Sequence, residues 1–184
     1  MEMMIFIGIV VAIIAGIIFM YNKLVTLRNS VRSSWSDIDV QLKKRFNLVP
    51  ALVETVKAYA KHESEVFDKV ATARSQAMQS GTPGEKGRSE NVFRETLKSL
   101  FAVAEAYPEL KANENFMSLQ KQFKAIEDDI ESARRYYNAV VRDYNTSTET
   151  FPSVLIASNF GFKPEEFFEL DSPEQRQPIR PDFS

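Results

Sequence analysis

The sequence predicts an all-α protein in which an N-terminal transmembrane helix precedes an antiparallel, up-and-down four-helix bundle. Residues Met3 to Asn22 carry no charge over twenty consecutive positions, which is the length needed to cross a bilayer. Two long stretches, 17–80 and 88–160, lack glycine, and apolar residues recur within them at the steps of three and four that mark a buried helix face. Strand patterns are nearly absent, and long helices with short loops favour an antiparallel bundle.

The first element is a predicted transmembrane anchor over residues 1–22. At 1.5 Å per residue the uncharged run spans about 30 Å as a helix, close to the hydrocarbon thickness of a bilayer. A cleaved signal peptide is the alternative. The segment has no basic start, its apolar stretch is longer than usual for such a peptide, and no small-residue cleavage motif follows. We therefore expect a retained anchor, with the lipid bilayer as a partner.

The charges that flank the span predict its orientation. Lys23, Arg28 and Arg32 follow it, whereas Glu2 is the only charged side chain before it. The positive-inside rule then places the bulk of the protein in the cytoplasm. Export of this part stays open, because many single-span anchors with short N-termini have the opposite orientation.

Small residues at Gly8, Ala12 and Gly16 lie four apart and therefore share one face of the anchor. Such spacing lets two transmembrane backbones approach closely and predicts a contact in a homo-oligomer. Glycine and alanine are also common in membrane helices generally, which is the alternative interpretation.

We expect a bundle domain over residues 23–170. Its first helix covers about 24–46, with one apolar stripe, and ends at Val49-Pro50, because the residue before proline disfavours helical geometry. A second helix begins at Pro50 and continues to about Ala77. The polar segment 80–87 then forms a flexible loop. The stripe of the first helix comprises Leu24, Leu27, Val31, Trp35, Ile38, Leu42 and Phe46.

The third helix is predicted over about 90–106 and stops near Tyr107-Pro108. The fourth, from about Phe116 to Tyr144, has apolar residues that alternate steps of three and four without a fault, as in a heptad seam. A short apolar segment, 154–168, follows. Residues 171–184 are rich in proline and charge and are predicted to be a disordered tail.

Several function classes are disfavoured by composition. The 23 basic residues are interleaved with 25 acidic ones, so no basic face for nucleic acid is expected. There is no cysteine, and no phosphate-binding loop or nucleophile elbow occurs. The single histidine, His62, lacks the second histidine of a zinc-protease motif and is expected at the surface. We therefore predict no enzymatic activity, no catalytic residue, no cofactor and no metal.

The densest acidic cluster comprises Glu127, Asp128, Asp129 and Glu131. Carboxylates on one helix are suitable ligands for a hard divalent cation. Basic residues four positions away, Lys124 and Arg135, instead suggest a solvated helix face with weak ion pairs. A metal-dependent sensor or enzyme that uses residues 127–131 remains the alternative function.

Two polar stripes are candidates for a partner-binding surface or an interhelical polar network. One lies on the first helix and the other on the fourth, and in each the residues are spaced to share a face. A solvated face is the other interpretation. The stripe residues are Asp37, Gln41, Arg45, Glu131, Arg134, Asn138 and Asn145.

Several segments, in this order, resemble the LemA family of bacterial membrane-anchored proteins. They are Tyr21-Asn22 with Leu24-Val25, residues 41–45, Leu48-Val49-Pro50 with residues 52–56, residues 101–110, residues 133–138, and Tyr144-Asn145 leading to Phe151-Pro152-Ser153. Phe46, Asn47 and Ala51 depart from the usual Tyr, Asp and Asn. The resemblance implies a four-helix bundle behind an anchor in the bacterial inner membrane, and it implies no established activity.

The function expected from these observations is a non-enzymatic scaffold or assembly protein. Its partners would be an unidentified membrane or envelope protein or further copies of itself. A membrane-shaping or membrane-sensing bundle is another alternative, because aromatic residues gather near the end of the chain. They are Phe160, Phe162, Phe167 and Phe168, and they would otherwise cover the end of the core.

Overall fold

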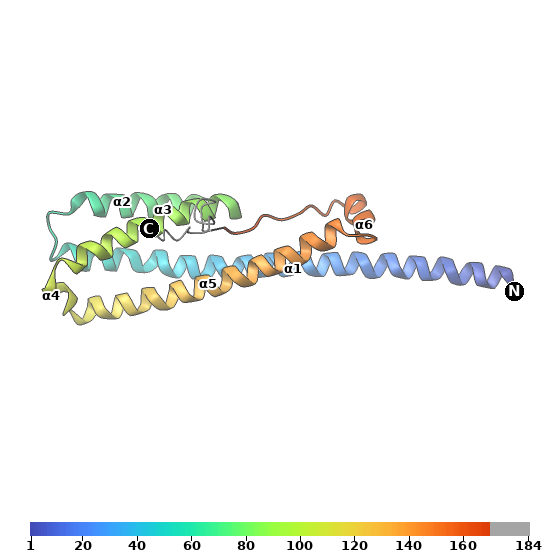
Figure 1. The fold of residues 1–184 in the computed structure, drawn as a ribbon, viewed down its shortest axis with the longest axis horizontal. Helices are drawn as coiled ribbons and strands as arrows, with labels where there is room; N and C mark the ends of the chain where they lie inside the picture. Colours follow the sequence, from blue (N-terminus) through green and yellow to red (C-terminus); the bar gives the residue numbers. More distant parts are fainter. Residues whose placement is uncertain (170–184) are drawn as a thin grey trace, which may run out of the picture. The chain divides into compact units, whose positions relative to one another are not determined.

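A computed structural model describes residues 1–169, and in this part the chain is helical without any strand. The all-α prediction is therefore confirmed for the described residues, whereas the predicted tail 171–184 lies outside them. Figure 1 shows the elements in chain order. They are α1 (Glu2–Lys57), α2 (Ser64–Gln79), α3 (Pro83–Glu105), α4 (Pro108–Lys111), α5 (Glu114–Glu149) and α6 (Ser153–Phe160).

The chain divides into two compact units. The first consists of Met1–Val40 and Glu131–Glu166, and the second of Gln41–Ile130 with the segment that begins at Phe167. Helices α1 and α5 each contribute residues to both units. The second unit also contains α2, α3 and α4.

Helix α1 continues through Pro50, so the predicted helix boundary at Val49-Pro50 is wrong. Proline has no N–H and leaves the carbonyl four residues earlier without its helical donor. That carbonyl belongs to Phe46, and the Nε of Arg74 on α2 donates a hydrogen bond to it at 2.8 Å. A side chain from a neighbouring helix thus replaces the missing backbone donor, and α1 extends to Lys57.

The predicted flexible loop 80–87 is also wrong over most of its length, because α3 already begins at Pro83. Thr82 and Glu85 form a capping box. The Glu85 N–H donates to Thr82 Oγ1 at 3.2 Å, and the Thr82 N–H donates to Glu85 Oε2 at 3.1 Å. These bonds satisfy two amides that a helix start leaves unpaired. At Gly87, within the helix, any Cβ would collide with the carbonyl oxygen of Glu169.

The seam predicted for the fourth helix is confirmed in α5. Its residues are alternately buried and half-buried, as expected when one stripe faces a core. The fully buried members are Phe116, Phe123, Ile130, Tyr137 and Tyr144. In addition, Val141 is buried although it lies beside the predicted seam.

In the first unit, polar side chains of α5 bind the extended segment that follows α6. The Asn145 amide donates to the Glu165 carbonyl at 2.9 Å and accepts from the Glu165 N–H at 2.8 Å. The Tyr137 hydroxyl donates to the Glu166 carbonyl at 2.8 Å. Burial raises the pKa of Tyr137 to about 12, with a further contribution from the charges of Glu165 and Glu166. The hydroxyl therefore stays a donor at neutral pH.

Replacing Arg74 by Met should destabilise the protein by about 1–3 kcal/mol, because the Phe46 carbonyl loses its donor in a partly buried site. The destabilisation by Arg74→Met should be smaller in a Pro50→Ala background, where the restored N–H at position 50 can donate to the Phe46 carbonyl. Unfolding followed by circular dichroism in detergent micelles would measure both values. Equal costs of Arg74→Met in the two backgrounds would contradict this role of Arg74.

Candidate functional site

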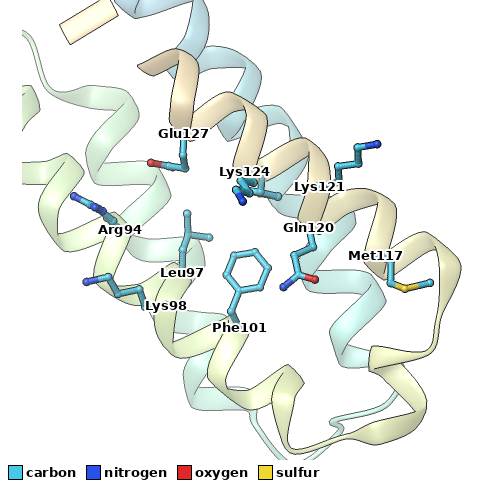
Figure 2. Close-up of a pocket in the computed structure, with 10 residues that line it drawn as sticks. Arg94, Leu97, Lys98, Phe101, Met117, Gln120, Lys121, Lys124 and Glu127 are labelled. Atoms are coloured by element: carbon cyan, nitrogen blue, oxygen red, sulfur yellow. The ribbon is translucent and has the colours of Figure 1, made fainter. Parts of the chain in front are cut away.

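The second unit carries an open groove of about 540 Å³ between α3 and α5. Figure 2 shows Leu97 and Phe101 projecting from α3 toward the side chains of α5. The volume is in the range of binding pockets for small molecules or side-chain anchors. Its lining consists of Arg94, Leu97, Lys98, Phe101, Met117, Gln120, Lys121, Phe123, Lys124 and Glu127.

The floor of the groove is apolar. Leu97 and Phe123 are buried, and Phe101 packs its ring edge-on against Phe123 with 5.8 Å between centroids. Met117 is 48% exposed at one end. Leu97 and Phe101 are four apart on α3, so they share the face of the helix that lines the groove. The groove thus has an apolar floor of the kind that receives apolar side chains of a ligand.

The rim is basic on both sides. Arg94 and Lys98 line the α3 wall, and Lys121 and Lys124 line the α5 wall. Lys98 forms an exposed ion pair with Glu95 at 2.6 Å, which contributes little stability. The other three make no ion pair with any residue among 1–169. The walls therefore present positive charge that the groove itself does not compensate.

Glu127 is the one carboxylate in the lining, and a buried arginine neutralises it. Arg45 of α1 is 2% exposed and pairs with Glu127 at 2.5 Å and with Glu90 of α3, itself 1% exposed. The Arg45 guanidinium also lies 5.1 Å from the centre of the Phe93 ring. Burial lowers the pKa of Arg45, and Glu127 partly offsets this. We call Arg45, Glu90 and Glu127 the buried ion network.

Arg45 therefore does not belong to an exposed partner-binding surface, contrary to the first interpretation of the polar stripes. A guanidinium in a core needs counter-charges, and both carboxylates come from other helices. The neighbouring Gln41 is half-buried, whereas Asp37 is exposed and lies in the first unit.

The polar stripe residues of α5 also differ from one another in burial and in binding partners. Asn145 binds backbone within its own unit, and the exposed Glu131 pairs with Arg135 at 2.8 Å. Arg134 and Asn138 are half-buried and make further contacts. The predicted stripe residues therefore differ in burial and in the partners that they bind.

The acidic cluster shows no arrangement suited to a cation. Among residues 1–169 no three or more His, Asp or Glu side chains lie close enough together to hold a metal ion. Glu127 is bound to Arg45 and Glu131 to Arg135. His62 is exposed. In the apolar start of α1, a Cβ added at Gly8 or Gly16 would meet no other atom.

The sequence analysis did not predict this groove. A usable signal exists in α5, where Lys121 and Lys124 flank the seam residue Phe123. The same holds in α3, where Arg94 and Lys98 flank Leu97. Basic residues beside an apolar stripe on two helices suggest a basic-edged groove, but the pattern does not say which two helices pack together.

Removing one charge of the buried ion network should be costly. Glu90→Gln should lower the free energy of unfolding by about 3–5 kcal/mol, because it leaves Arg45 buried with one counter-charge. The pair Arg45→Met with Glu90→Leu should cost less than the sum of the single changes. Chemical unfolding in detergent micelles would measure this, with the exposed Glu131→Gln as the matched control. Additive costs would show that the two residues act independently.

Comparison with known proteins matches most of the chain to one family and to several relatives. The LemA family matches residues 34–183. The chain is 26% identical over 196 residues to magnetosome proteins MamQ 1 and MamQ 2 of Paramagnetospirillum magneticum, covering 92% of this chain and 72% of each relative. It is 23% identical over 158 residues to protein LemA of Metamycoplasma hominis, covering 84% and 71%. This chain belongs to the LemA family.

Proposed function

We propose that this protein is a membrane-anchored, non-enzymatic scaffold that binds a protein partner through the groove between α3 and α5. The groove is the observation that carries the proposal, because it joins an open apolar floor to a rim of uncompensated charge. No reacting group is needed for this role. The process that the scaffold serves is assembly at a membrane.

The anchor is supported by the apolar start of α1. This helix is long and apolar enough to cross a membrane, and none of its most apolar stretch is buried within the described residues. Ile7, Ile14 and Phe19 are 53%, 51% and 70% exposed. Such a row of exposed apolar side chains is stable in lipid rather than in water. We propose the bacterial inner membrane, as the family resemblance implies, and the basic residues after the span favour the cytoplasmic side for the groove.

For the part behind the anchor we propose the antiparallel four-helix bundle of the family. Two contacts support it within the second unit. Arg45 of α1 pairs with carboxylates on α3 and α5, and Arg74 of α2 binds the Phe46 carbonyl of α1. Helices α2 and α3 also lie side by side (Figure 1). The groove is then a fixed surface between rigid helices, as partner recognition requires.

A photo-crosslinking amino acid in place of the exposed Gln120 tests the scaffold role. In intact membranes it should form a specific adduct with another protein or a second copy of the chain, because Gln120 lines the groove. The adduct should disappear when Lys121→Glu and Lys124→Glu are added. The same amino acid in place of Gln76, exposed on α2, is the control. Equal labelling from both positions would contradict the proposal, and the compartment of the partner would test the cytoplasmic placement.

A second candidate function, contact with the membrane surface, is supported by α6. Tyr21 lies at the end of the uncharged run, and the Phe160 ring meets it edge-on with 5.0 Å between centroids. Phe160 and Leu155 are nonetheless 58% and 54% exposed. Phe162 and Phe168, by contrast, are buried. Tyrosine rings favour the membrane interface, and the contact of Phe160 with Tyr21 therefore supports a membrane contact of α6.

Tryptophan fluorescence tests the contact of α6. In a Trp35→Phe background, which removes the only natural tryptophan, Phe160→Trp should be quenched by lipids brominated near the head group. Val92→Trp, at a position on α3 that is 53% exposed, is the control and should be quenched less. Equal quenching of the two, measured in proteoliposomes, would rule out a specific membrane contact of α6.

A further inference from the structure

We infer that the groove between α3 and α5 binds an acidic, amphipathic α-helix of a partner protein. This inference rests on the proposed scaffold function and names its ligand. The ligand helix would carry apolar anchors at positions i, i+3 or i+4, and i+7, with acidic residues on both sides of that stripe.

The charge of the groove selects the charge of the ligand. Four basic side chains surround the apolar floor, two on each wall. The one carboxylate, Glu127, is held by Arg45 from inside the core, so it does not neutralise the lysines. Complementary potentials steer association and reject partners of like charge. A basic or neutral helix would therefore be disfavoured.

The symmetry of the rim further restricts the ligand. Arg94 and Lys98 stand on one wall, and Lys121 and Lys124 on the other. A helix in the groove would place its apolar stripe on Leu97 and Phe101, with one flank toward each wall. Acidic residues on both flanks would then each meet a cation. A ligand with acidic residues on only one flank would leave half of the rim unpaired.

The length of the groove agrees with a helix of about two turns. Its α3 wall runs from Arg94 to Phe101, which is seven steps, or about 10 Å along a helix. Apolar anchors at i and i+7 of a ligand helix are separated by the same distance, about 10 Å. Anchors with this spacing are typical of helices bound in apolar grooves. A free inorganic anion would leave the apolar floor uncovered.

A designed peptide of fourteen residues tests the inference directly. It carries leucines at three anchor positions, i, i+4 and i+7, and glutamates on both flanks of this stripe. With the full-length chain in nanodiscs of zwitterionic lipid, fluorescence anisotropy should show saturable binding that weakens as salt increases. A peptide of the same composition with scrambled leucines, and one with lysine in place of glutamate, should each bind at least about tenfold more weakly. Empty nanodiscs control for partition into lipid.

Variants of the chain localise the binding. The double variant Lys121→Glu with Lys124→Glu should bind the glutamate peptide about tenfold more weakly, because two favourable charge contacts become repulsive. Lys57→Glu with Lys61→Glu changes the net charge equally at exposed positions outside the groove lining, so it should have little effect. Phe101→Ala should also weaken binding. A circular dichroism spectrum of each variant would verify that it is folded.

Three results would overturn the inference. They are no saturable binding of the glutamate peptide, equal binding of the scrambled peptide, and equal effects of the two double variants. If dodecyl phosphate binds with saturation while the peptide does not, the groove accepts a small anionic amphiphile instead. If the peptide fails but the crosslinker at position 120 still forms its lysine-dependent adduct in membranes, the scaffold function stands and only the ligand class is wrong.

Discussion

The pairing of Arg45 with Glu90 and Glu127 is the constraint on which the second unit depends. It joins α1, α3 and α5 through charges that cannot be separated without leaving one of them unpaired in the core. Removing such charges from water costs free energy of hydration. The network therefore contributes more to the specificity of helix packing than to the stability of the fold. The same packing of α3 and α5 that brings Glu90 and Glu127 to Arg45 also forms the walls of the groove.

A second constraint acts on α1, where a proline would ordinarily end or bend the helix. Arg74 donates the hydrogen bond that Pro50 cannot donate. A tertiary contact, and not the local sequence, therefore keeps α1 continuous at the proline. The two arginines thus have related roles. Each extends from one helix to satisfy a polar group on another, and together they connect α1 with all three of the longer helices that contribute to the second unit.

The sequence predicts the helices whose signal is local and periodic. The seam from Phe116 to Tyr144 and the apolar run after Met3 are visible as patterns, and α5 and the start of α1 agree with them. The error at Pro50 arises from a non-local partner, Arg74, which no short window of sequence around the proline contains. The error at residues 83–87 has a local cause, because the capping box of Thr82 and Glu85 and the proline in the first turn start α3 there. The groove also depends on tertiary structure, because its two walls, residues 94–101 and 117–127, come from two different helices. Arg45 was recognised as one of a stripe, but its burial depends on carboxylates from two other helices.

Glu127 takes part in both the groove and the ion network, because its carboxylate lines the groove and also pairs with the buried Arg45. A ligand that binds only the folded state shifts the folding equilibrium in proportion to its concentration over its dissociation constant. Occupancy of the groove and unfolding of the second unit are therefore thermodynamically linked. The melting temperature of the intact protein consequently reports on ligand binding, even for compounds that carry no label and trigger no reaction.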